Sequence, residues 1–145
     1  MKRLAAAASL FSLVLLFNLS SNAQSNSGAA DSAAVRATVT GYIEAYYTGD
    51  ANRMEQSLHP HYVKLMLHGD IPIRQKTGME MVREVRKNGP ANLPASAKTE
   101  QVSVLDIAGN IASAKLVTPG WTDYVTLSKI DGQWKILSVV QRIDS

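Results

Sequence analysis

Residues 121–140 read WTDYVTLSKIDGQWKILSVV, and this stretch predicts an antiparallel hairpin that closes a β-sheet. Apolar and polar side chains alternate on both sides of Asp131-Gly132, and Asp-Gly between two alternating runs is a strong signal of a tight hairpin turn. Two earlier strands are expected at residues 102–107 and 111–117, with the turn pair Gly109-Asn110 between them. The last third of the chain is therefore predicted to be a meander of antiparallel strands.

Helices are expected ahead of this meander. A first helix is predicted from a cap at Asp31 or Ser32 to Gly49, because apolar residues recur there at helical spacing. Asp50 is expected to cap a second, shorter helix. Thr77 and Glu80 have the spacing of a capping box that opens a third helix, and this helix is expected to stop at Asn88-Gly89-Pro90 and to bury Met79, Val82 and Val85.

One strand is expected between the second and third helices. Residues 61–67 alternate, with Val63, Leu65 and Leu67 on one face and Tyr62, Lys64 and Met66 on the other. A short extended piece is expected at residues 71–74. Helices segregated from a run of antiparallel strands predict an α+β fold, with the helices packed on one face of a curved sheet.

The N-terminal residues are typical of an export signal. Lys2 and Arg3 precede an uncharged apolar run at residues 4–19, and Ser21-Asn22-Ala23 provides small residues for cleavage before Gln24. The run is shorter than the roughly 20 apolar residues of a membrane-spanning helix. We therefore expect a signal peptide at residues 1–23, a disordered Ser/Asn/Gly-rich spacer at 24–30, one domain at 31–145, and a periplasmic or secreted protein without a membrane anchor.

Composition excludes several classes of protein. The chain has no cysteine, so it forms no disulfide, offers no thiolate for catalysis or metal binding, and cannot be a lipoprotein. Its 15 basic and 12 acidic side chains give a net charge of +3, which falls to +1 once Lys2 and Arg3 are removed. The densest basic cluster, Arg83, Arg86 and Lys87, has no aromatic partners for base stacking, so nucleic-acid binding is not expected.

Three stretches carry a resemblance to a known family. They are residues 42–50, with a Gly-Asp junction after the first helix, residues 58–62, with a His-Pro pair, and residues 122–136, with Asp-Tyr and Asp-Gly-x-Trp elements. The chain resembles the nuclear transport factor 2-like superfamily and, within it, the small exported putative lumazine-binding proteins. The resemblance implies a cone-shaped α+β fold, in which helices pack on the concave face of a curved antiparallel sheet and leave a pocket between them. It implies no metal or cofactor.

Asp123 is the leading candidate for chemistry. By strand parity it shares a face with Trp121, Val125 and Leu127, so it is expected to point into an apolar pocket. Burial would raise its pKa and suit it to act as a general base. The alternative is a structural carboxylate that accepts hydrogen bonds near the end of a strand.

Tyr42, Tyr46 and His61 complete the candidate ligand-binding set with Trp121 and Asp123. Tyr42 and Tyr46 share a helix face, where they would serve either the core or the pocket. His61 shares parity with the neighbouring apolar residues of its strand, so it would reach the pocket mouth, unless it is a half-exposed strand-entry residue.

No metal site is expected. His59 and His61 alternate as ligands on a strand can, but Pro60 disturbs the strand between them and no third ligand is evident nearby. His68 falls on the opposite face from His61 if the strand stays regular.

Residues 135–140 are apolar on both parities, which predicts that both faces of the last strand are covered. A second subunit is the simplest cover, and the resemblance implies a homodimer through the sheet. Leu137 and Val139 are the candidate contact residues.

The sequence leaves three interpretations open, of which two use this pocket and one has no pocket. The first is a non-enzymatic exported protein that binds a small, flat, mostly apolar or aromatic molecule between Trp121, Asp123 and the two helix tyrosines. The alternative is an acid–base enzyme of the isomerase or dehydratase kind, with Asp123 as base and His61 or a tyrosine as acid. The third is an interaction module with a filled cone.

Overall fold

The computed structural model describes residues 11–69 and 71–144. These residues divide into two compact units, 1–31 and 32–145, and the described part of the first unit is helical. The elements, in chain order, are α1 (Phe11–Thr48), α2 (Ala51–Ser57), β1 (Leu58–Leu67), β2 (Arg74–Thr77), α3 (Gly78–Asn88), the 3-10 turn η1 (Ala95–Ala97), β3 (Gln101–Ala108), β4 (Ile111–Val117), β5 (Trp121–Ile130) and β6 (Gln133–Ile143).

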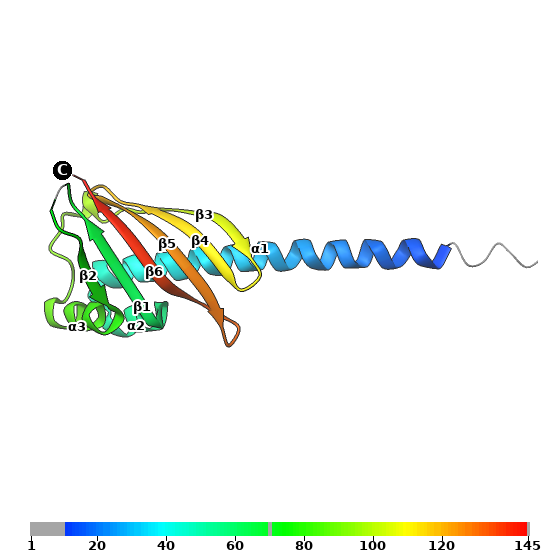
Figure 1. Cartoon of the computed structure of the whole chain (residues 1–145), viewed down its shortest axis with the longest axis horizontal. Helices are drawn as coiled ribbons and strands as arrows, with labels where there is room; N and C mark the ends of the chain where they lie inside the picture. Colours follow the sequence, from blue (N-terminus) through cyan, green and yellow to red (C-terminus); the bar gives the residue numbers. More distant parts are fainter. Residues whose placement is uncertain (1–10, 70, 145) are drawn as a thin grey trace, which may run out of the picture. The chain divides into compact units, whose positions relative to one another are not determined.

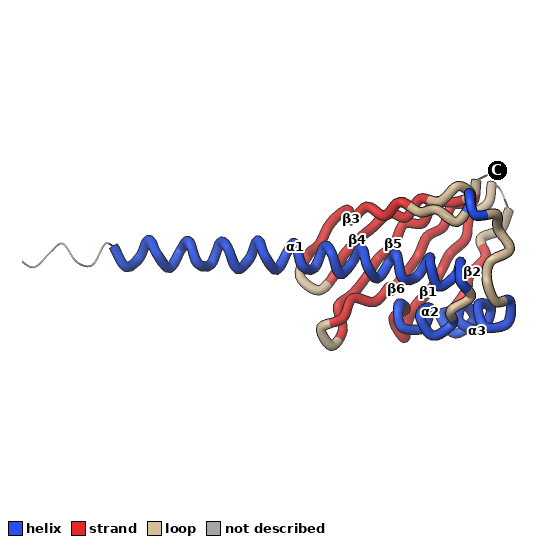
Figure 2. Tube along the Cα trace, turned by 180° about the vertical axis from the view of Figure 1, so that it is seen from behind, coloured by secondary structure: helices blue, strands red, loops and turns tan. Residues whose placement is uncertain are grey.

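The second unit is an α+β fold, as the sequence predicts. Its six strands form one sheet in the order β2-β1-β6-β5-β4-β3. The part of α1 that belongs to this unit crosses one face of the sheet, while α2 and α3 lie near the end that carries β1 and β2 (Figure 1 and Figure 2). The helices thus cover one face of the sheet and leave the other without a helix.

The sheet is mixed, which corrects the expected all-antiparallel arrangement. The β3–β4–β5–β6 meander and the β1–β2 pair are antiparallel, but β1 lies parallel to β6, with Lys64 opposite Val139. Turn signals in a sequence report only the pairing of neighbouring strands. They carry no information on the pairing of β1 with a strand about 70 residues later.

The capping box of α3 is present as predicted. The Glu80 backbone N–H donates to Thr77 Oγ1 at 3.3 Å, and the Thr77 backbone N–H donates to Glu80 Oε2 at 2.7 Å. The expected burial of Met79 is wrong, since 71% of this residue is exposed and Met81 is buried in its place. Met81, Val82 and Val85 form the buried face of the helix, and Met79 lies on its solvent side.

The N-terminal segments differ from the sequence expectation in two respects. Residues 24–30, expected as a disordered spacer, are helical, and α1 continues through Asp31 and Ser32, where a cap was expected. The good helix formers Ala29, Ala30, Ala33 and Ala34 on both sides of this position favour the continuous helix. Residues 1–10 of the expected signal peptide lie outside the described residues. Cleavage after Ala23 stays a prediction. Among residues 11–69 and 71–144, no helix is long and apolar enough to span a membrane.

The face of β1 that points into the core is not the one that its hydrophobic residues suggest. Tyr62, Lys64 and Met66 are buried beneath the helices, whereas Val63 and Leu65 are only partly buried on the opposite face. Because Lys64 pairs with Val139, which is fully buried, its side of β1 must face the core. A lysine is tolerated there because a buried carboxylate lies nearby.

A β-bulge in β6 overturns one of the predicted surface residues. Thr126 pairs with Ser138 and Leu127 with Ile136, so Leu137 is the extra residue of the bulge. The bulge reverses the parity that follows, which places Val139 fully in the core. Val139 is therefore not available as a contact residue, and Val140, 42% exposed, occupies the outer face.

The core lies between the helices and the covered face of the sheet. Its largest completely buried apolar side chains come from α1, α2 and the three strands β4, β5 and β6 and are Val35, Val39, Ile43, Met54, Leu116, Val125, Leu127, Ile136 and Val139.

Candidate ligand-binding site

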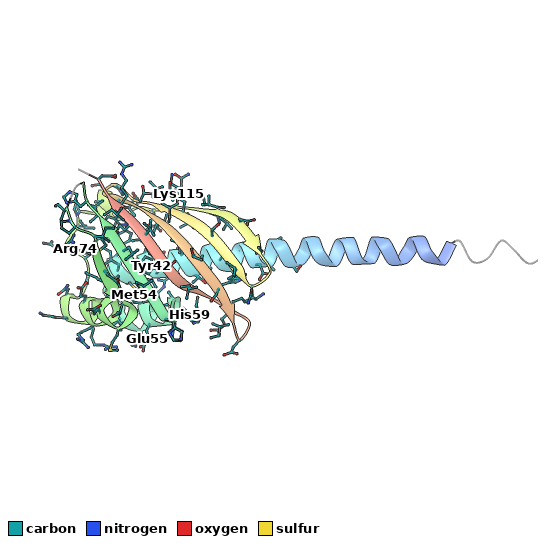
Figure 3. All side chains as sticks on the ribbon, viewed as in Figure 1. Tyr42, Met54, Glu55, His59, Arg74 and Lys115 are labelled. Atoms are coloured by element: carbon teal, nitrogen blue, oxygen red, sulfur yellow. The ribbon has the colours of Figure 1, made fainter. Side chains whose placement is uncertain are left out.

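A cavity of about 520 Å³ lies within the second unit, on the covered face of the sheet. This volume suits a small-molecule site, since such pockets commonly measure roughly 300–1,000 Å³. Figure 3 shows Tyr42 on α1 where the helix passes behind the sheet. The lining residues come from α1, β1, β2, α3, the loop that follows α3, β5 and β6, and they include Tyr42, Tyr46, Lys64, Met66, Met81, Trp121, Asp123 and Gln141.

A buried ion pair forms the polar centre of this cavity. Lys64 Nζ on β1 lies 3.8 Å from Asp123 Oδ2 on β5, and the two side chains are 7% and 0% exposed. Burial raises the pKa of Asp123, against the opposing effects of the Lys64 ammonium and of the nearby Gln141 and Trp121 side chains. Burial likewise lowers the pKa of Lys64, against the effect of the Asp123 carboxylate. Both groups are thus shifted toward their neutral forms.

Two tyrosines extend the pair into a chain of polar groups. Lys64 Nζ donates a hydrogen bond to the Tyr42 hydroxyl at 3.0 Å, and that hydroxyl lies 3.4 Å from the Tyr62 hydroxyl. Burial raises the pKa of both phenols well above the ordinary value, so they stay protonated at neutral pH. This series of polar groups can therefore relay a proton between the Lys64 ammonium and the Tyr62 hydroxyl.

Trp121 is held at the cavity by the turn that precedes β5. The Thr118 hydroxyl donates to the Trp121 carbonyl at 3.1 Å and accepts from the Trp121 backbone N–H at 3.2 Å. The Trp121 ring meets the Tyr46 ring edge-to-face, with 5.9 Å between centroids, and Tyr46 is 37% exposed. The two rings therefore make an aromatic wall that reaches solvent.

Three buried polar atoms on the cavity wall have no hydrogen-bond partner among the described residues. They are Trp121 Nε1, Asp123 Oδ1 and Asp123 Oδ2. Nearly all buried polar groups in proteins are satisfied, because leaving one unpaired costs roughly 1–3 kcal/mol. Lys64, Gln141 and Trp121 lie near enough to Asp123 to lower its pKa, but none forms a well-aligned hydrogen bond with it, so the indole N–H and the carboxylate retain the capacity to bind a molecule in the cavity.

The rim carries a second, more exposed ion pair. Lys76 Nζ on β2 contacts Glu84 Oε2 on α3, with side-chain exposures of 29% and 46%. The turn at Asn88–Asn92 completes the rim, and its Ala91 N–H donates to the Tyr47 carbonyl at 3.2 Å. This bond ties the rim to the end of α1.

The structure brings together four of the five predicted ligand-binding residues. Tyr42, Tyr46, Trp121 and Asp123 all line the cavity. His61 does not, because it is exposed on β1 outside the residues that line the cavity. The inward face of β1 carries Tyr62 and Lys64, and His61 lies on the opposite face.

The histidines form no metal centre in the described part of the chain. The rings of His59 and His61 lie 5.6 Å apart, and the His61 backbone N–H donates to His59 Nδ1 at 3.0 Å. Figure 3 places His59 at the start of β1. Within residues 11–69 and 71–144, no three His, Cys, Asp or Glu side chains lie close enough to hold a metal ion.

Lys64 is the candidate site residue that the sequence analysis did not identify. Its signal was present, since Lys64 interrupts an otherwise apolar or aromatic set, Tyr62 and Met66, on one strand face. A charge in such a set requires a buried partner, and Asp123 was already a candidate. Pairing the two required knowledge that β1 lies beside β6.

Solved structures with the same fold are numerous. An NTF2-like protein of unknown function from Methylobacillus flagellatus KT is 22% identical, with a TM-score of 0.63, over 79% of this chain and 93% of that one. A second, from Silicibacter pomeroyi DSS-3, is 19% identical with a TM-score of 0.63 over 77% and 94%. A ketosteroid isomerase-like protein from Erwinia carotovora atroseptica is 12% identical with a TM-score of 0.57 over 79% and 97%. These likenesses establish the nuclear transport factor 2-like fold.

The family assignment comes from the sequence itself. A search of curated proteins finds no match to this chain. A family model described as putative lumazine-binding, in contrast, matches residues 30–141, which include every residue of the Lys64–Asp123 centre and both aromatic wall residues. The family model covers most of the chain, and the fold agrees with that of the solved structures. The chain therefore belongs to the putative lumazine-binding family of the nuclear transport factor 2-like superfamily.

Proposed function

We propose that this protein binds a small, flat molecule in the cavity between the Tyr46–Trp121 wall and the Lys64–Asp123 centre. The observation that carries this proposal is a set of buried polar atoms that form no hydrogen bond among the described residues, Trp121 Nε1 and both Asp123 carboxylate oxygens, on the wall of a cavity of about 520 Å³. If the protein's own side chains filled the cavity, they would be expected to form hydrogen bonds with these buried atoms. A ligand that pairs with them recovers the cost of burying them.

The polar groups on the cavity wall determine which polar groups the ligand must carry on the edge that faces them. An indole N–H donates, a carboxylate accepts, and an ammonium donates, so the complementary edge carries alternating C=O and N–H groups. Lumazine, the compound in the family's description, is a flat bicyclic ring with such an edge. The remaining ring surface would lie against the apolar lining, including Met66, Met81 and Val85.

Binding of lumazine or a related cyclic amide is expected to quench the fluorescence of Trp121 saturably. The chain has two tryptophans, and Trp134 is 4% exposed in the core and does not line the cavity. The Trp121→Phe variant should therefore lose the quenching. Asp123→Asn should weaken binding about tenfold or more, equivalent to about 1.4 kcal/mol, because it loses a charged acceptor.

His61→Ala is the matched control, because His61 is exposed and lies outside the cavity lining. It should bind as the unmodified protein does. Native mass spectrometry of the purified protein gives the independent check. An apo mass, together with no quenching by any cyclic amide in the panel, would overturn the proposal.

We propose further that the protein is exported to the periplasm or beyond, because Lys2 and Arg3 precede the apolar run at 4–19 and the Ser21–Ala23 cleavage signal. Expression of the full chain in a bacterial host is expected to give a periplasmic or secreted product that begins at Gln24, as read from its intact mass. A cytoplasmic product that retains residues 1–23 would contradict export.

We also propose that the uncovered sheet face forms a homodimer. Tyr124 and Val140 pair across β5 and β6 on this face and are 52% and 42% exposed, and Leu65 pairs with Val140 from β1. Light scattering at micromolar concentration should give a dimer mass, and Tyr124→Lys with Val140→Lys should give a monomer. Met79→Lys, at an exposed position on α3 and therefore on the opposite side of the sheet, is the control. A monomeric unmodified protein would refute this assembly.

Acid–base catalysis is the second candidate function. It is favoured by one observation, the buried Asp123 carboxyl whose pKa is raised beside a chain of Lys64, Tyr42 and Tyr62. Such a carboxyl is suited to remove a proton from a bound substrate, and the Lys64–Tyr42 pair is suited to return one. In that case Asp123→Asn would abolish turnover while leaving ligand binding measurable.

A further inference from the structure

We propose that Lys64 is a covalent attachment point, whose amine forms a reversible imine with an aldehyde or ketone held in the cavity. The ligand would be a small carbonyl compound with a largely apolar body. This inference rests on the proposed small-molecule function of the same cavity, and it assigns to Lys64 a chemical role beyond hydrogen bonding.

The first support is the position of the amine. The Lys64 side chain is 7% exposed and belongs to the cavity lining, so a ligand reaches its Nζ only through the cavity. Within residues 11–69 and 71–144, Nζ donates one hydrogen bond, to the Tyr42 hydroxyl at 3.0 Å, and lies 3.8 Å from Asp123 Oδ2. It therefore has donor capacity left and space in front of it.

The second support is the set of proton-donating and proton-accepting groups around the amine. Imine formation needs an unprotonated amine, a group that accepts a proton from nitrogen, and a group that protonates the departing oxygen. Burial lowers the pKa of Lys64, which increases the fraction of free amine. Burial also raises the pKa of Asp123, so its protonated form is easier to reach than that of a solvated aspartate, and the group is placed to give a proton to oxygen and to take one from nitrogen.

The step balances with the groups present. The Nζ lone pair attacks the carbonyl carbon, a C–N bond forms, and the C=O electron pair moves to oxygen, which takes a proton from the Asp123 carboxyl. The nitrogen then loses a proton to the Asp123 carboxylate. The hydroxyl receives that proton from Asp123 and leaves as water, which gives a protonated C=N group beside the Asp123 carboxylate. Transfer of the remaining N–H proton to Asp123 restores its carboxyl and gives the imine. One amine and one carbonyl give one imine and one water, without an oxidant or reductant.

Lys76 provides a contrast within the same cavity. It also lines the cavity, but its ammonium is paired with the Glu84 carboxylate at the rim, and its side chain is 29% exposed. The Lys76–Glu84 pair stays in contact with water, which favours its charged form, whereas the Lys64–Asp123 pair is almost completely excluded from water. The inference therefore assigns attachment to Lys64 alone of these two residues.

Reductive trapping on the full chain tests this assignment. Benzaldehyde with sodium cyanoborohydride converts each imine to a stable benzylamine, as the hydride of the reductant adds to the C=N carbon. At neutral pH and limiting aldehyde, peptide mapping by mass spectrometry should find Lys64 labelled about tenfold or more faster than Lys115 on the outer face. The difference is expected because burial lowers the pKa of Lys64 and so increases its fraction of free amine. Labelling that follows exposure, with Lys64 no faster than Lys115 or Lys76, would overturn the inference.

Two variants separate this result from folding and from the proposed function. Lys64→Arg keeps a cation at the site but forms no imine, so the fast label should disappear, whereas Lys115→Arg should retain it. If lumazine quenches Trp121 while Lys64 stays unlabelled, the binding proposal stands and the imine fails. If Lys64 is labelled quickly but no cyclic amide quenches Trp121, covalent attachment stands and the cyclic-amide proposal fails. If neither occurs, both fail.

Discussion

Replacing Gly49 with alanine is expected to lower the free energy of unfolding by about 3 kcal/mol. Gly49 follows α1 with φ of +75°, and a Cβ there would lie 2.4 Å from the Gly89 carbonyl carbon and 2.5 Å from Pro90 N. The left-handed conformation costs an L-residue roughly 1–2 kcal/mol, and forcing an extra methyl group into a packed site typically costs 1–3 kcal/mol more. Both contacts are backbone atoms, so no side-chain rotation relieves them.

Gly132→Ala is the matched control for this prediction. Gly132 has the same φ of +75°, but a Cβ there would meet nothing within 4 Å. It should therefore lose only about 1 kcal/mol, the conformational cost alone. Chemical denaturation of both variants measures the difference. Equal losses for Gly49→Ala and Gly132→Ala would mean that the end of α1 does not pack against the Gly89–Pro90 turn.

This contact also bears on the cavity. Gly89 and Pro90 belong to the cavity lining, and the Ala91 N–H donates to the Tyr47 carbonyl at the end of α1. The close approach of Gly49 thus fixes the rim to the helix that carries Tyr42 and Tyr46. Ligand affinity should consequently fall in Gly49→Ala and stay unchanged in Gly132→Ala.

Lys64→Met is expected to destabilise the fold by about 3 kcal/mol at neutral pH. The substitution leaves the Asp123 carboxyl, which is 0% exposed, without its cation, and removing one partner of a buried ion pair typically costs roughly 3–5 kcal/mol. The double variant Lys64→Met/Asp123→Leu should recover most of this loss, because replacing both partners by apolar residues is often neutral. If the double variant is as unstable as the sum of the single ones, the two groups do not interact.

The loss in Lys64→Met should also depend on pH. A folded-state pKa above the unfolded value means that the native protein binds more protons than the unfolded chain, so stability falls as pH rises through that interval. Burial already raises the pKa of Asp123, and removal of the ammonium raises it further. The variant should therefore be nearest to the unmodified protein below about pH 4, the ordinary pKa of an aspartate, and lose stability as pH rises above it. Equal losses at all pH values would exclude a titrating Asp123.

Much of the fold followed from local signals. The meander, the α3 capping box and the Asp50 cap of α2 each rest on residues within a few positions of one another, and each is present. The parallel pairing of β1 with β6 was not predictable in this way, because no local signal reports a pairing across about 70 residues. The β6 bulge was equally hidden, since the residues 135–140 are apolar on both parities.

The candidate site shows the same difference between residues placed by local patterns and residues placed by strand pairing. Asp123, Trp121, Tyr42 and Tyr46 were found by parity within single elements, and all four line the cavity. The positions of His61 and Lys64 were not predictable in this way, because the orientation of β1 depends on its partner strand. The charge on Lys64 resists burial by itself and is accommodated only by the carboxylate on β5. Its position therefore follows from tertiary structure and not from hydrophobic patterning.

The most direct test of the account is a crystal structure of the protein with the cyclic amide that binds most tightly in the fluorescence assay. The compound is expected in the cavity, with its polar edge within hydrogen-bond distance of Trp121 Nε1 and Asp123 and its ring beside Tyr46. A compound bound outside the cavity, or a cavity closed by its own side chains with Asp123 and Trp121 paired to protein groups, would contradict the central claim.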